Sequence, residues 1–122
     1  MAESKNIKSD LIPKIATGFC GGLARTCGIC GAVSGAVMVI NIFCGRNALD
    51  VPYEKSYAPV QKFIKMFTEK FGSANCKELI GVDLGTEEGR KQFHVNNMRE
   101  RCRNITEEAT RMAMSMIAGE SL

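Results

Sequence analysis

Residues 28–43 read GICGAVSGAVMVINIF, a run of 16 residues without a charged side chain. A segment this apolar has to be buried, either inside a protein or in a bilayer, and a helix needs about 20 residues to cross a bilayer. The run is shorter than that, so we expect a buried core helix and no membrane insertion. Its small residues Gly28, Gly31 and Gly35 recur at spacings of three and four, which predicts a stripe where another backbone approaches closely.

Two further segments carry apolar residues at helical spacing. The first covers residues 60–71, follows a turn region that contains Pro52 and Pro59, and ends at Gly72. The second covers residues 97–116, with charged residues on the other faces of the helical wheel. Both patterns predict amphipathic helices that pack against the apolar helix.

Two short helices are expected between these long ones. Ser73 is placed to cap the first and Gly81 to stop it, while Thr86 followed by two glutamates is typical of a second helix start. No segment shows the alternation of a strand, so the sequence predicts an all-α fold. We expect a compact bundle of about four or five helices with a glycine-rich loop leading into the buried apolar helix. At 122 residues, the chain is expected to form a single cysteine-rich helical domain over residues 1–122.

The charge and histidine content narrow the classes of function. The 16 Lys and Arg residues exceed the 13 Asp and Glu residues by three, too small an excess to indicate a nucleic-acid partner. His94 is the only histidine, which argues against a multi-histidine metal site. The first residues, MAESKNIKSDLIPK, lack the apolar core of a signal peptide, so we expect a cytoplasmic location. In that compartment, cysteines serve metal or redox chemistry more often than structural disulfides.

The sharpest chemical signal is the CxxC motif Cys27-Gly28-Ile29-Cys30 at the entrance of the apolar helix. A helix N-terminus carries partial positive charge, which lowers the pKa of a nearby thiol from about 8.5. We therefore expect Cys27 and Cys30 to be redox thiols. The thioredoxin fold is excluded because no strand flanks the motif. The alternative is that both residues are small core side chains, a common role for free cysteine.

Cys76 and Cys102 each lie on the apolar face of a predicted helix, so we expect both to point toward the same interior as Cys30 and Cys44. Four converging thiolates suit an iron-sulfur cluster or a tetrahedral zinc ion. The predicted metal ligands are therefore Cys27, Cys30, Cys76 and Cys102. Iron-sulfur ligation is preferred to zinc because no second CxxC is present, and a chain without a cofactor stays an alternative.

The glycine-rich stretch GFCGGLARTCGICG does not match a phosphate-binding loop, because GK[ST] is missing and no strand precedes it. Backbone amides that donate to thiolate or cluster sulfur fit the glycines better, so Gly28, Gly31 and Gly35 are the candidate cofactor-binding positions. The arginines around Cys102, at positions 99, 101 and 103, would lower its pKa if their side chains reached it.

The run ATGFCGGLARTCGICGAVSGAVMVIN, with CKELIGVDL around Cys76 and RCRNITEEATRMA around Cys102, resembles the C-GCAxxG-C-C family of redox-active proteins. Residues 30–35, CGAVSG, correspond to the family's CGAxxG core. The resemblance implies a small helical domain with a redox or metal role, often associated with oxidoreductase or transporter systems. It also implies that an earlier helix with a first cysteine is missing here, with Cys27 the best-placed substitute.

The leading hypothesis is a redox protein that uses clustered cysteine thiolates for thiol-disulfide exchange or for iron-sulfur ligation in electron transfer. Its expected partner is a redox protein or oxidoreductase, and a homodimer could complete a site from fewer thiols per chain. The alternative hypothesis is a structural or accessory subunit whose cysteines bind zinc or fill the core. The sequence identifies no substrate pocket and therefore no named reaction.

Overall fold

The computed structural model describes residues 1–120, and every regular element within them is a helix. This confirms the predicted all-α class. The elements are η1 (Glu3–Lys5), α1 (Leu11–Ala16), η2 (Thr17–Phe19), α2 (Cys20–Leu23), α3 (Gly31–Cys44), α4 (Glu54–Phe71), α5 (Cys76–Ile80), α6 (Glu87–Val95) and α7 (Arg99–Ile117). In this part of the chain, no helix combines the length and apolar character needed to cross a membrane.

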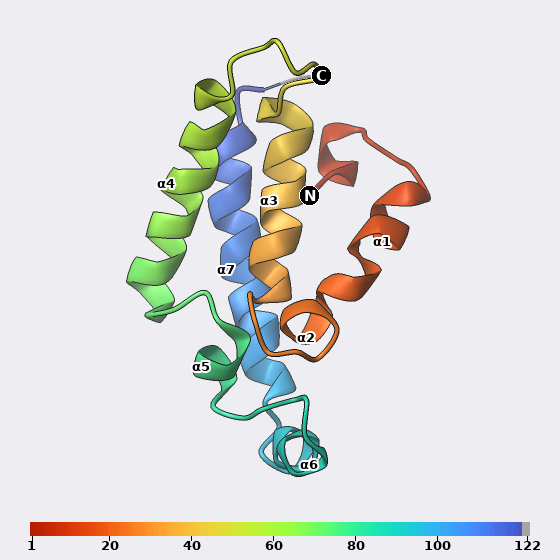
Figure 1. Ribbon diagram of the computed structural model, residues 1–122, viewed down its shortest axis with the longest axis vertical. Helices are drawn as coiled ribbons and strands as arrows, with labels where there is room; N and C mark the ends of the chain where they lie inside the picture. The colour runs from red at the N-terminus through yellow and green to blue at the C-terminus, as the bar shows by residue number, and fades with distance from the viewer. Residues whose placement is uncertain (121–122) are drawn as a thin grey trace.

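The three longest helices, α3, α4 and α7, lie side by side along the long axis of the molecule and contact one another pairwise (Figure 1). Their buried side chains recur at helical spacing, so that each helix turns one apolar face inward. These side chains are Val33, Ala36, Val39 and Ile40 of α3, Phe63 and Phe67 of α4, and Ile105, Ala109, Met112, Ala113 and Ile117 of α7. The core therefore lies between the three helices.

The short elements α2, α5 and α6 gather at one end of this bundle, whereas the connection from α3 to α4 lies at the other end (Figure 1). α2 contacts both α3 and α5. The start of the chain is attached to the end of α7, because Lys5 Nζ donates hydrogen bonds to the carbonyl oxygens of Ala118 and Glu120, each at 3.2 Å. The cysteine-bearing loops are thus separated from the chain ends.

Two local predictions are wrong. Pro59 lies inside α4 and not in a turn, because the helix already begins at Glu54, where the amides of Ser56 and Tyr57 bond to the Tyr53 carbonyl. Proline in the second turn removes one hydrogen bond without preventing the helix.

The cap of α5 also differs from the prediction. Asn75, rather than Ser73, caps α5 by accepting a hydrogen bond from Lys77 N. Ser73 Oγ instead accepts a hydrogen bond from Asn75 N, at 2.9 Å, and so shapes the turn before the helix. Gly81 ends α5 in left-handed conformation, and Thr86 caps α6, as predicted.

We predict that Phe67→Ala lowers the free energy of unfolding by about 3–5 kcal/mol, because it leaves a cavity in the centre of the core. Phe67 is 0% exposed, whereas Leu49, in the connection from α3 to α4, is 89% exposed. Leu49→Ala is therefore the control and should change stability by less than about 0.5 kcal/mol. Urea denaturation measures both, and equal effects would contradict this account of the core.

Candidate functional site

The predicted CxxC loop is joined to the start of α5 by backbone hydrogen bonds. Cys30 N donates to Ala74 O at 2.8 Å, and Cys76 N donates to Gly28 O at 2.7 Å. An isolated antiparallel bridge connects the same two segments. These contacts bring Cys76 next to the CxxC motif, although α3 and α4 separate them in the sequence.

The segment before the CxxC motif has an unusual backbone. Residues 21–25 all have positive φ, from 54° at Ala24 to 70° at Gly21 and Leu23, and Cys27 has φ 56°. This left-handed conformation costs a residue other than glycine about 1–2 kcal/mol. Thr26 Oγ1 stabilises the turn by donating hydrogen bonds to Gly22 O, at 3.0 Å, and to Leu23 O, at 2.8 Å. Strain of this kind concentrates at functional sites.

Gly22 allows this turn to pack directly against the thiol region. A Cβ atom at Gly22 would lie 2.7 Å from the backbone nitrogen and oxygen of Gly28 and 2.8 Å from Cys76 Cβ. These distances are too short for any side chain, so the close approach of the turn to the CxxC loop requires glycine here.

Cys27 and Cys76 form the buried part of the site, and each is 7% exposed. The Cys27 sulfur accepts a hydrogen bond from Leu84 N at 3.1 Å, which ties the CxxC loop to the loop after α5. The pKa of Cys76 is raised from 9.0 to about 12, mainly by burial and then by the charge and hydrogen bonding of Cys27, with smaller contributions from the charges of Cys30 and Cys102. Cys27, Cys30 and Cys102 are therefore close enough to Cys76 to affect its ionisation.

Cys30 and Cys102 are the half-buried part of the site. Burial raises the pKa of the Cys102 thiol, and the charges of Cys30 and Cys20 add to the effect. Arg101 opposes this shift but does not reverse it. The sequence predicted a lower pKa on the condition that the arginines reach Cys102. The charge of Arg101 does lower it, but burial outweighs this effect, and Arg101 Nε donates a hydrogen bond to the Leu79 carbonyl at 2.6 Å.

A cavity of about 610 Å³ opens beside these thiols. Cys30, Cys76 and Cys102 line it, as does the exposed Cys20, which the sequence reasoning did not select. Cys27 is not among the lining residues. The signal that could have identified Cys20 is its place in the same glycine-rich stretch as the CxxC motif. The cavity volume lies within the range of about 300–1,000 Å³ that is typical of small-molecule sites.

The three glycines predicted to bind a cofactor have different surroundings. A Cβ atom at Gly31 would lie 2.7 Å from Phe19 O, and one at Gly28 would lie 3.4 Å from Gly22 O. Gly35 has no atom within 4 Å of the position of a Cβ, so the predicted close approach along the whole stripe is wrong at this residue. The backbone contacts stop at the first turn of α3 because α2 ends there.

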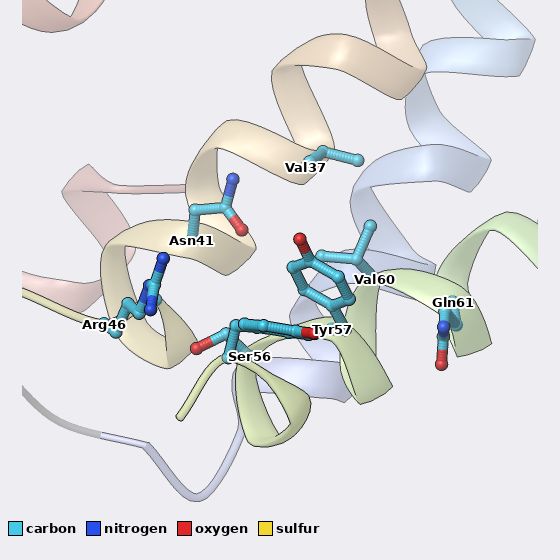
Figure 2. Close-up of a pocket in the computed structure, with 9 residues that line it drawn as sticks. Val37, Asn41, Arg46, Ser56, Tyr57, Val60 and Gln61 are labelled. Carbon is cyan, nitrogen blue, oxygen red and sulfur yellow. The ribbon is translucent and has the colours of Figure 1, made fainter. Parts of the chain in front are cut away.

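The expectation that Cys44 shares an interior with the other cysteines is wrong, because Cys44 is the last residue of α3 and lies at the opposite end of the bundle (Figure 1). Near it lies a second cavity of about 540 Å³, formed by the end of α3 and the start of α4. Figure 2 shows Asn41, Arg46 and Tyr57 at this cavity. No cysteine lines it within the described residues, so it is separate from the thiol site.

Metal binding requires at least three donor atoms around one point. Cysteine sulfur is a suitable donor for zinc and for iron-sulfur clusters. Among residues 1–120, however, no group of three or more His, Cys, Asp or Glu side chains is arranged to hold a metal ion. Cysteine sulfur is thus a suitable type of donor, but the side chains of the described residues are not arranged around one metal ion. Metal ligation by the four cysteines stays a prediction.

These features define a helical protein in which five of the six cysteines, all except Cys44, gather at one end of a three-helix core. The chain belongs to the family described as "Putative redox-active protein (C_GCAxxG_C_C)", whose model matches residues 1–116. This confirms the resemblance found in the sequence.

A protein of Archaeoglobus fulgidus described as "Uncharacterized protein" is 27% identical over 127 residues. The match covers 96% of this chain and 78% of that protein. No solved structure matches the chain.

We predict that Gly22→Ala lowers the free energy of unfolding by about 2–4 kcal/mol, from the clash with Gly28 and Cys76 and the cost of a left-handed alanine. The matched control is Gly35→Ala, inside α3 with open space around it, which should be neutral or stabilise the protein by up to about 1 kcal/mol. Thermal and urea denaturation measure both. Equal responses would contradict the close packing of the turn.

We also predict that alkylation by iodoacetamide near neutral pH modifies the exposed Cys20 first and Cys76 last. Cys76 is buried, and its pKa of about 12 keeps it protonated. In the unfolded chain this thiol ionises at its ordinary pKa of 9.0, whereas in the folded protein it ionises only near 12. The free energy of unfolding should therefore decrease as the pH rises from 9.0 toward 12. Peptide mass spectrometry follows the labelling. Equal labelling rates at Cys76 and Cys20 would contradict the prediction.

Proposed function

We propose that the chain is a dithiol-disulfide redox protein whose electrons are carried by Cys27, Cys30, Cys76 and Cys102. The observation that carries this proposal is that thiols from three segments meet: Cys30, Cys76 and Cys102 line one cavity, and Cys27, from the same loop as Cys30, is close enough to raise the pKa of Cys76. The description of the family as redox-active supports the same class of function.

Cys30 is the thiol best placed to begin the exchange. It is half-buried, lines the cavity and immediately precedes the first turn of α3. The positive end of a helix favours a negative charge there. The Cys30 thiolate attacks one sulfur of an oxidised substrate or partner disulfide, forms a mixed disulfide and displaces the other sulfur as a thiolate, which takes up a proton.

Cys102 completes the reaction. It lines the same cavity, and it is close enough to Cys30 for the charge on Cys30 to raise its pKa. After losing its proton to solvent, Cys102 attacks the Cys30 sulfur and releases the second substrate thiolate. The protein then contains a Cys30–Cys102 disulfide, and two electrons and two protons have passed to the substrate.

Cys27 and Cys76 provide a second dithiol behind the first. Cys76 lines the cavity and interacts with both Cys27 and Cys30. The Cys76 sulfur attacks Cys30 in the Cys30–Cys102 disulfide while its proton passes to the departing Cys102 sulfur, and Cys27 then attacks Cys76 in the same way, with its proton passing to the departing Cys30 sulfur. The buried pair is thereby oxidised while the accessible pair is reduced, so the protein stores four electrons in total.

Ligation of an iron-sulfur cluster or zinc is the second candidate, favoured by the amide of Leu84, which donates to the Cys27 sulfur as amides do to metal-bound thiolates. In either case we expect a redox protein or oxidoreductase as partner. The expected cytoplasmic location fits thiol exchange, because cellular thiols there return such cysteines to the reduced form.

The test is oxidation of the reduced protein by a small disulfide, followed by peptide mapping of the disulfides formed. We expect a bond between Cys30 and Cys102 or between Cys27 and Cys76. We expect Cys30→Ser to slow oxidation by at least about tenfold, because it removes the entry thiol. Cys44→Ser is the matched control: it replaces a half-buried cysteine at the other end of α3 and should leave the rate unchanged.

The same preparations, purified without oxygen, are analysed for iron and zinc. Unchanged oxidation in Cys30→Ser, with no disulfide among the four cysteines, would contradict thiol exchange. One or more metal atoms per chain, lost in Cys30→Ser but not in Cys44→Ser, would establish the second candidate instead. If the protein forms no such disulfide and contains no metal, while both variants fold normally, a structural or accessory role is favoured instead.

A further inference from the structure

The ionisable side chains around the thiol cavity, apart from the cysteines, are all basic. Arg25, Arg90, Arg99 and His94 line the cavity. No aspartate or glutamate is found among its lining residues in the described part of the chain. A cavity lined by charges of one sign attracts small ions of the opposite sign. The charged groups around the thiols therefore favour an anion.

The arginines at the cavity differ from two other arginines of the chain in whether they form ion pairs. Arg103 and Arg111 of α7 form ion pairs with Glu100 and Glu108, one helical turn away. Within residues 1–120, none of the arginines that line the cavity forms an ion pair with a carboxylate. Their charge is therefore not neutralised by the protein and is available to a ligand.

Arg90 is held in place without losing its charge. Its Nη1 donates a hydrogen bond to the Leu84 carbonyl at 3.0 Å. The other N–H groups of the guanidinium do not take part in this bond and can donate to a ligand. Gly31 and Ala32, in the first turn of α3, also line the cavity. The first N–H groups of a helix have no partner within the helix, so this turn adds further donors suited to an anion.

We infer that the substrate of the thiol cavity is a small anionic disulfide, a molecule in which carboxylate groups flank an S–S bond. This inference rests on the proposed thiol exchange and adds the class of substrate. The carboxylates are held by Arg25, Arg90 and Arg99, which places the S–S bond toward Cys30 and Cys102. A cavity of about 610 Å³ accommodates a small molecule of this kind.

The reaction at this site is a two-electron reduction. Cys30 attacks the substrate disulfide and releases one anionic thiolate, and Cys102 attacks Cys30 and releases the second. Two protein thiols become one disulfide, and the substrate becomes two thiols after each thiolate takes up a proton. Two successive thiolate leaving groups depart from a basic cavity, which stabilises the negative charge that they carry.

The experiment compares two probe disulfides, the dianion 5,5′-dithiobis(2-nitrobenzoate) and the neutral 4,4′-dithiodipyridine. Both release a coloured product, and each rate is divided by the rate of the same probe with free dithiothreitol to remove differences in intrinsic reactivity. We expect a corrected preference for the dianion of at least about tenfold at low salt. We expect this preference to fall steeply when salt is added, because salt screens the charges.

The variant is Arg25→Gln combined with Arg99→Gln, two exposed side chains at the cavity. We expect the preference for the dianion to fall at least about fivefold. Arg111→Gln is the control: it removes one positive charge from α7 outside the cavity and should retain the preference. Circular dichroism establishes that all variants are folded.

The outcomes separate the two levels of the proposal. If both probes oxidise the protein to an internal disulfide but the dianion has no corrected advantage, or if Arg111→Gln loses as much preference as the double variant, the anionic substrate is excluded and thiol exchange stands. If neither probe produces an internal disulfide, thiol exchange itself fails and the substrate inference fails with it.

Discussion

Two backbone hydrogen bonds determine how the cysteines of this protein come together. The bonds from Cys30 N to Ala74 O and from Cys76 N to Gly28 O attach the CxxC loop to the start of α5, and everything else at the site is built around that junction. The left-handed turn packs on one side of it through Gly22. Without the junction, Cys76 would have no reason to lie near residues that precede α3.

The junction also divides the thiols into an inner and an outer pair. Cys27 is enclosed by the turn, α5 and the loop that follows it, where Leu84 N donates to its sulfur, whereas Cys30 begins α3 at the edge of the cavity. In the proposed mechanism, this difference in burial separates the thiol that meets a substrate from the thiols that store electrons. The spacing of two residues between the cysteines therefore places the two sulfurs in different environments instead of side by side.

The sequence was sufficient to predict the helices from residue 28 onward, but it predicted neither the short helical elements of residues 3–23 nor how the loops meet. Apolar spacing predicted α4 and α7, and the cap at Thr86 was correct, because these features depend on neighbours three or four residues apart. The start of α4 was missed because proline marks a turn or the first helical turns equally well.

The left-handed turn was missed for another reason. Leu23, Ala24 and Arg25 have positive φ, and these residue types carry no sequence signal for that conformation. The cavity, and the participation of Cys20 and Arg90 in it, depends on contacts between α2, α5, α6 and α7 that periodicity does not encode.

The raised pKa values at Cys76 and Cys102 bear on the direction of electron flow in the proposed mechanism. A dithiol that is stabilised as a thiolate holds its electrons tightly, and its disulfide is then a strong oxidant. Burial does the opposite here, since it disfavours the thiolate at both residues. Ionisation of Cys76 and Cys102 therefore gives the reduced protein no stabilisation, so these two thiols are better suited to donating electrons than to accepting them. The basic residues at the cavity lie on the solvent side of these sulfurs, where they act on the charge of an incoming disulfide.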